Sequence, residues 1–139
     1  VSYPNHVPEE QVNGDHEKGY IRYLGYQPDV NRYIECADCI VLPSYHEGLS
    51  RVLMEGLAMG KPIITTNIPG CRETVADGQN GFLVQPRSTE SLIEAVRKFL
   101  SLSNTDRDAM GKFSRKLAEE IFDIREVIKV YKKITGGSI

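Results

Sequence analysis

The stretch that decides the fold reads CIVLPSYHEGLSRVLME and covers residues 39–55. Its first part, from Cys39 to Leu42, is a short apolar run typical of a strand that is buried on both faces. The loop that follows this run ends in Glu47. In an open α/β sheet, ligands bind at the carboxyl ends of the strands, where helix N-termini offer unpaired N–H groups to anions. We therefore expect Glu47 to lie beside a phosphate-sized site.

A second glutamate, Glu55, ends the same stretch. If the run from Ser50 onward is helical, Glu55 lies about 7.5 Å further along the helix axis, at roughly 1.5 Å per residue. At that separation the two carboxylates cannot share one proton or one metal ion. We expect them to hold hydroxyl groups at the two ends of an extended ligand.

Short strand patterns alternate with helix patterns along the rest of the chain, which is typical of a parallel sheet with crossover helices. The expected strands are residues 21–24, 39–42, 63–66 and 82–84. The expected helices are 29–37, the run from Ser50 to Gly60, a short turn at 72–76, a helix capped by Ser88 through Leu100, 106–121 and 125–134. Together they predict an α/β fold, a Rossmann-like three-layer αβα arrangement with about four short parallel strands.

Five pieces of sequence then occur in a characteristic order: YLG (23–25), ADCIVLPS (37–44), the two glutamates, GKPIITT (60–66) and PGCRETVADGQNGFLV (69–84). This order resembles the C-terminal nucleotide-sugar-binding domain of the retaining glycosyltransferases of the GT-B fold, family four, the glycosyl transferases group 1. The resemblance covers about residues 19–122. It implies a truncated second half of that domain, with 1–18 as a polar lead-in, 19–100 as the αβ core and 101–139 as C-terminal helices.

The resemblance also implies roles for individual residues. It places Glu47 against the transferred sugar as the catalytic residue, and Glu55 at the ribose hydroxyls of the nucleotide. It assigns the remaining donor-binding positions to the backbone N–H groups of Gly48, Leu49, Ser50 and Arg51, and to Tyr26 near the base.

The implied reaction is transfer of a sugar, of hexosyltransferase type, from a nucleotide-diphosphate donor with retention at the anomeric carbon and without a bound metal. A UDP-sugar is the expected donor, and it is a substrate, so no cofactor is expected. The expected acceptor is a growing bacterial cell-surface polysaccharide, such as a capsule, or a lipid-linked glycan. It would be bound by an N-terminal domain that this chain lacks, and the chain alone is expected to be inactive.

Two other function classes stay open. UDP-sugar 2-epimerases share the GT-B fold, but they lack this spacing of glutamates within PSYHEG. A non-catalytic flavodoxin-like or receiver module shares the fold class alone. A receiver should carry an acidic cluster after its first strand and an aspartate after its third, and the sequence shows no such set.

Composition is compatible with the resemblance without requiring it. The 139 residues fit one domain, the 40% hydrophobic content can form a core, and a net charge of −2 gives no reason to expect nucleic acid. No apolar run is long enough to span a bilayer. We expect a cytoplasmic protein, and the basic residues of the last helices leave peripheral membrane association open.

Cysteine usage and the expected sheet edge add two further expectations. Three cysteines are an odd number, which argues for a reducing compartment. Cys36, Cys39 and Cys71 are interpreted as small core hydrophobes, in preference to redox or zinc ligands. Residues 21–24 would leave an unpaired strand edge, through which the isolated chain is expected to self-associate.

Overall fold

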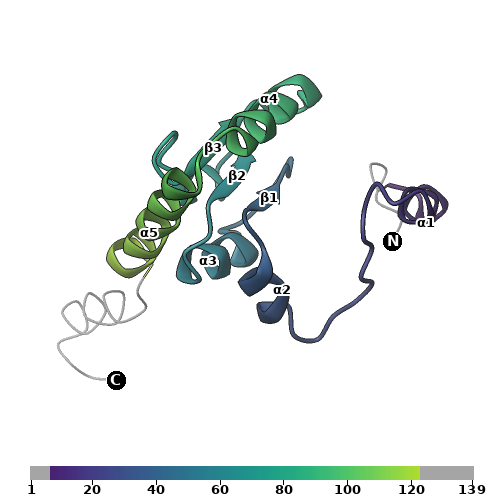
Figure 1. Ribbon diagram of the computed structural model, residues 1–139, viewed down its shortest axis with the longest axis horizontal. Coiled ribbons are helices and arrows are strands. Elements are labelled where there is room, and N and C mark those ends of the chain that lie inside the picture. The colour runs from purple at the N-terminus through teal and green to yellow at the C-terminus, as the bar shows by residue number, and fades with distance from the viewer. Residues whose placement is uncertain (1–6, 123–139) are drawn as a thin grey trace. The chain divides into compact units, whose positions relative to one another are not determined.

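The computed structural model describes residues 7–122, and the chain falls into two units, Val1–Val30 and Asn31–Ile139. Within the first unit, helix α1 spans Glu9–Glu17 and buries none of its residues (Figure 1). The expected polar lead-in is therefore partly helical. Glu9 and Glu10 stand in its first turn, where acidic side chains stabilise the positive end of the helix dipole.

The expectation of a strand at 21–24 is wrong. These residues form neither helix nor strand, and Ile21 and Tyr23 are about half exposed. A strand needs a neighbouring strand to satisfy its backbone groups, and within the described residues none pairs with this segment. A strand-like local pattern is insufficient where such a partner is missing.

The second unit is built on a sheet of three parallel strands in the order β1-β2-β3. Their bounds are Ile40–Leu42 for β1, Ile63–Thr66 for β2 and Gly81–Val84 for β3. In the register, Ile64 lies between Val41 of β1 and Phe82 of β3. The predicted parallel α/β class is thus confirmed, with three strands in place of about four.

Helices cover both faces of this sheet (Figure 1). They are α2 (Asn31–Cys36), α3 (Arg51–Ala58), the 3₁₀ turn η1 (Arg72–Thr74), α4 (Thr89–Leu100) and α5 (Asn104–Ile121). Between residues 7 and 122, no helix has the length and apolar content needed to cross a membrane. The predicted helix at 125–134 lies outside the described residues.

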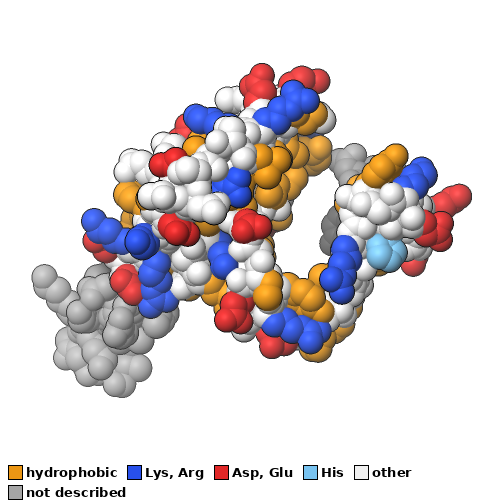
Figure 2. Space-filling model, viewed as in Figure 1, with side chains coloured by type: hydrophobic (Ala, Val, Ile, Leu, Met, Phe, Trp, Pro, Cys, Tyr) orange, Lys and Arg blue, Asp and Glu red, His pale blue; other side chains and the backbone are white. Residues whose placement is uncertain are grey.

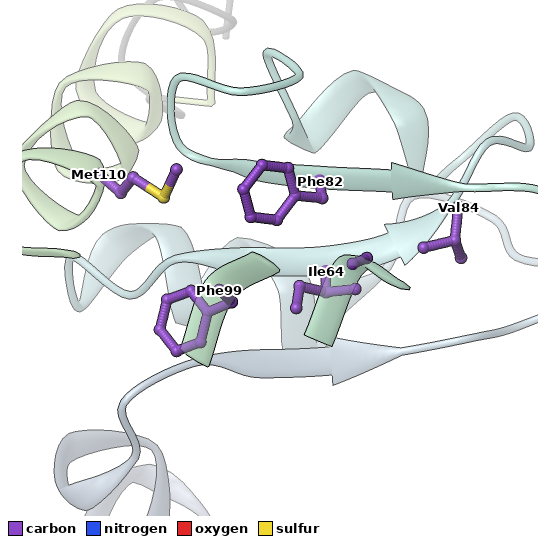
Figure 3. Close-up of a cluster of buried hydrophobic side chains, with 6 residues drawn as sticks. Ile64, Phe82, Val84, Phe99 and Met110 are labelled. Atoms are coloured by element: carbon purple, nitrogen blue, oxygen red, sulfur yellow. The ribbon is translucent and has the colours of Figure 1, made fainter. Parts of the chain in front are cut away.

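Two apolar clusters hold the layers together. On one face, Phe82 and Val84 of β3 pack with Ile64, with Phe99 of α4 and with Met110 of α5 (Figure 3). The other cluster is centred on α3 and contains Leu53, Leu57, Ile63, Cys71 and Val75. Because α5 contributes to both clusters, this helix belongs to the core of the unit.

Local signals explain the helix ends. Ser88 caps α4 as predicted, since its hydroxyl accepts a hydrogen bond from the Ser91 N–H at 3.1 Å. Ser103 does the same for α5, which therefore begins slightly before the predicted residue 106. After α3, Gly60 adopts a φ of 66°, a left-handed conformation that ends the helix.

Basic side chains stabilise the C-terminal ends of three helices. These ends carry unsatisfied carbonyl groups and partial negative charge. The pairs are Lys61 with the Glu35 carbonyl of α2 (2.7 Å), Arg115 with the Ala58 carbonyl of α3 (2.6 Å) and Arg107 with the Leu100 carbonyl of α4 (2.7 Å). All three cations line a pocket of about 380 Å³ beside Pro62, which precedes β2 and so lies away from the carboxyl ends of the strands. We interpret this basic cluster as structural.

Over the face shown in Figure 2, basic side chains are interspersed with acidic ones.

Candidate functional site

Two loops meet at the carboxyl ends of β1 and β2. The loop after β1 carries Glu47 and Gly48, and the loop after β2 carries Gly70. The Ser50 N–H donates a hydrogen bond to the Gly70 carbonyl at 3.2 Å. Gly70 has a φ of 87°, and a Cβ at this position would overlap the carbonyl oxygen of Gly48. The first loop is therefore supported by the backbone of the second.

Glu47 has the character of a group that is free to bind a ligand. Its side chain is exposed in the loop before α3. Within residues 7–122, its carboxylate takes part in no ion pair. A solvated carboxylate of this kind can accept hydrogen bonds from hydroxyl groups without first breaking an internal contact.

Glu55 lies further along α3, as the spacing predicts. Its side chain is only 26% exposed, and its Oε1 accepts from the Arg51 Nε at 2.8 Å. Arg51 itself is 88% exposed, so this pair contributes little to stability. The effect of the pair is to orient a half-buried carboxylate through one of its two oxygens.

The N-terminus of α3 differs from those of α4 and α5. Ser50, Ser88 and Ser103 are all N-cap residues. Ser88 and Ser103 use their hydroxyls to satisfy an N–H group of the first turn, whereas Ser50 makes no such side-chain bond. The start of α3 therefore keeps N–H groups available to an anion, and the helix dipole favours negative charge there.

The structure brings most of the predicted site residues together around this helix start. Gly48 has open space where a Cβ would lie, Leu49 is 51% exposed, and Ser50 is buried. Arg51 opens the helix. Tyr26 lies in the first unit, where its side chain is 91% exposed.

The sequence interpretation missed the contribution of the loop after β2. The sequence pattern predicts only a short turn at 72–76, and Glu73 stands there in η1. Its carboxylate also accepts a hydrogen bond from the Gly70 N–H at 2.8 Å. The spacing of Gly70 and Glu73 in PGCRE is visible in the sequence. The contact of Gly70 with the loop after β1 is tertiary, and only the structure shows it.

Two of the three cysteines, Cys39 and Cys71, have raised pKa values. Burial raises the pKa of Cys71, and the carboxylates of Glu47 and Glu73 raise it further, against a lowering by the Thr65 hydroxyl. Burial also raises the pKa of Cys39, to about 12. The expectation that all three are core residues holds for Cys71 but is wrong for Cys36, which is exposed. Residues 7–122 contain no group of side chains arranged to hold a metal ion.

A small pocket of about 160 Å³ opens beside the glutamate loop. It is bounded by Pro43 after β1, Thr66 at the end of β2, Val84 at the end of β3 and the first turn of α4. Arg87 closes one side, with its guanidinium 5.3 Å from the centre of the Tyr45 ring. The carboxyl ends of all three strands thus form one concave edge.

Comparison with known proteins agrees with this geometry. The family model described as Glycosyl transferases group 1 matches residues 10–117. Spore coat protein SA of Bacillus subtilis is 31% identical over 93% of this chain and 36% of its own length. The N,N'-diacetylbacillosaminyl-diphospho-undecaprenol alpha-1,3-N-acetylgalactosaminyltransferase of Campylobacter jejuni is 30% identical over 59% of this chain and 22% of its own length.

A solved structure shows the same fold. The Anabaena protein Alr3699/HepE, crystallised in complex with UDP, superimposes with a TM-score of 0.80 at 19% identity, over 91% of this chain and 36% of its own. The chain thus spans about a third of the length of the first relatives that it matches. The matching family is one of glycosyl transferases, and the match covers most of the sequence. It therefore favours the transferase family over the epimerases and the signalling modules. The chain belongs to the glycosyl transferases group 1 family.

Proposed function

We propose that this chain is the donor-binding part of a retaining glycosyltransferase, the second half of a GT-B C-terminal domain. The donor is a UDP-sugar. Glu47 contacts the transferred sugar, and Glu55 accepts hydrogen bonds from the ribose hydroxyls. The backbone N–H groups from Gly48 to Arg51 bind the diphosphate and sugar between them, and Tyr26 lies near the base.

The uncapped start of α3 is the observation that carries this proposal. A serine that could cap the helix leaves its first-turn N–H groups unsatisfied, although Ser88 and Ser103 cap their helices. A diphosphate supplies the acceptor oxygens and negative charge that such a helix start favours. Carboxylates stand before and within the same helix, which suits a ligand with a sugar on each side of a diphosphate.

The chemistry follows from this placement. The bond between the anomeric carbon and the diphosphate oxygen breaks, and the acceptor hydroxyl attacks from the same face. Its proton passes to the leaving phosphate oxygen. N–H groups aimed at the departing diphosphate stabilise the charge that develops on it, while Glu47 stabilises positive charge near the sugar ring. The two carboxylates are not a hydrolase pair, because those face each other across one bond.

The acceptor is proposed to be a cell-surface polysaccharide or a lipid-linked glycan. The name of the Campylobacter relative specifies a diphospho-undecaprenol acceptor, which supports this class. A lipid-linked acceptor would place the enzyme at the cytoplasmic face of a membrane. The predicted self-association cannot use an edge at residues 21–24, because these residues form no strand. It stays a prediction, with β1 as an outer strand of the described sheet.

Calorimetric titration of the 139-residue chain with UDP tests the proposal, with GDP as the base control. Wild-type chain should bind UDP saturably, and Glu55→Ala should bind it at least about tenfold more weakly, because hydrogen bonds to a charged group contribute about 1.5–3 kcal/mol. Glu90→Ala, which removes an exposed first-turn glutamate of α4, should leave the affinity unchanged. A folded wild-type chain that does not bind UDP, or a Glu55→Ala variant of unchanged affinity, would contradict the proposal.

A further inference from the structure

We infer that Gly70 and Glu73 are positioning residues for the sugar end of the donor site. They fix the two peptide groups that follow Glu47 and Gly48, and with them the catalytic carboxylate. The inference rests on the proposed function for the role of Glu47, but the contacts that support it are independent of any ligand.

Gly70 supports these two peptide groups by direct contact. A Cβ at Gly70 would lie 2.7 Å from the Glu47 carbonyl oxygen and would overlap the Gly48 carbonyl. The Gly70 carbonyl also accepts from the Ser50 N–H at 3.2 Å. Gly70 therefore lies against the loop that carries Glu47 at two places, the Glu47 and Gly48 carbonyls and the Ser50 N–H, and only glycine fits there.

Glu73 holds Gly70 in turn. Its Oε2 accepts from the Gly70 N–H at 2.8 Å, which is a charge-assisted hydrogen bond. Glu73 belongs to η1, and the neighbouring Thr74 is anchored because its hydroxyl donates to the Cys71 carbonyl at 2.7 Å. The carbonyl of Thr74 accepts from the fully buried amide of Asn80. A continuous series of contacts thus joins the core to the loop that carries Glu47.

This support reaches Glu47 and Ser50, the N-cap of α3, but not Glu55. Glu55 is positioned by α3 itself and by Arg51, and neither of these contacts Glu73 through a hydrogen bond or ion pair in the described structure. Loss of the Glu73 contact should therefore weaken recognition of the sugar more than recognition of the nucleotide. A residue needed only for folding would weaken both together.

The variants form matched pairs. Glu73→Ala removes the acceptor for the Gly70 N–H, whereas Glu73→Gln keeps an acceptor oxygen at the same distance. Gly70→Ala introduces the overlap with Gly48. Gly78→Ala is its control, because Gly78 has a similar φ of 78° but nothing within 4 Å of its Cβ position.

The first readout is the position of the loop, measured on the 139-residue chain by amide NMR without ligand. In Gly70→Ala and Glu73→Ala, the Gly48 amide resonance should shift more than any amide outside the two loops. In Gly78→Ala and Glu73→Gln it should stay close to its wild-type position. A Gly48 resonance that does not respond to Gly70→Ala or Glu73→Ala overturns the inference, whether or not the chain binds nucleotides.

The second readout separates the inference from the proposed function. The affinity for UDP is compared with the affinities for UDP-glucose, UDP-galactose and UDP-N-acetylglucosamine. The UDP-sugar that binds most tightly relative to UDP is then used, and the gain is the ratio of its affinity to the affinity for UDP. Glu73→Ala should reduce that gain severalfold, because Glu47 is no longer held in place, while the affinity for UDP itself falls less. Equal losses for UDP and UDP-sugar would overturn the inference alone. Absence of any UDP binding by wild-type chain would instead refute the proposed function.

Discussion

Replacing Asn80 by aspartate should destabilise the α/β unit more than its small change in shape suggests. Asn80 is fully buried in the turn before β3. Its Oδ1 accepts from the Ala76 N–H at 2.8 Å, and its Nδ2 donates to the Thr74 carbonyl at 3.0 Å and to the Ser114 hydroxyl at 3.3 Å. One amide therefore joins the turn, η1 and α5, and it needs both a donor and an acceptor.

The magnitude follows from those contacts. An ionised aspartate at this position cannot donate to the Thr74 carbonyl, and the loss of a buried hydrogen bond costs about 1–3 kcal/mol. Burial also raises the pKa of the new carboxyl above its ordinary value of about 3.9, and each unit of that shift costs about 1.4 kcal/mol at neutral pH. We expect the free energy of unfolding to fall by about 3 kcal/mol or more at pH 7.

Urea unfolding followed by far-UV circular dichroism measures this change. The stability of Asn80→Asp should recover as the pH falls from 7 towards 4, because a carboxyl whose pKa is raised by folding stabilises the folded state when protonated. Asn67→Asp is the matched control, since Asn67 is exposed. A loss below about 1 kcal/mol at pH 7, or one equal to that of the control, would refute the reasoning.

Three further changes test other parts of the structure. Gly111→Ala should lower the free energy of unfolding by about 1–3 kcal/mol, because the new methyl group overlaps the Gly60 carbonyl, and unchanged urea unfolding would contradict that contact. Arg115→Leu should cost at most about 1 kcal/mol through loss of the carbonyl cap on α3, and a loss of several kcal/mol would mean that the basic cluster does more than cap helices. Iodoacetamide at pH 8 should modify the exposed Cys36 well before Cys39, whose pKa is about 12, and mass spectrometry showing the reverse order would count against the described burial.

Local sequence signals predict the elements whose stability is decided locally. Ser88 caps α4 as expected, because a hydroxyl and the N–H three residues on are sufficient for that contact. The run from 63 to 66 is a strand buried along its whole length, as its apolar and β-branched residues indicate. Residues 21–24 look equally suitable but form no strand, because strand formation depends on a neighbour that a local pattern does not contain.

The same limit applies to side chains whose role is tertiary. Gly56 carries a cost in an isolated helix, and its advantage appears only where a Cβ would meet the Ile40 and Ile63 side chains at 2.9 and 3.1 Å. In the sequence, Arg115 resembles a solvated surface residue, and only the structure shows its contact with the end of α3. In the site, the order of Glu47 and Glu55 around a helix start is readable from spacing, whereas the support that Gly70 gives to this loop is not.

A crystal structure of this chain with UDP would test the central claim most directly. We predict that a ribose hydroxyl lies within hydrogen-bond distance of the Glu55 carboxylate and that the diphosphate contacts the N–H groups at the start of α3. UDP bound elsewhere on the unit, with Glu55 still paired only to Arg51 and the start of α3 facing solvent, would contradict it.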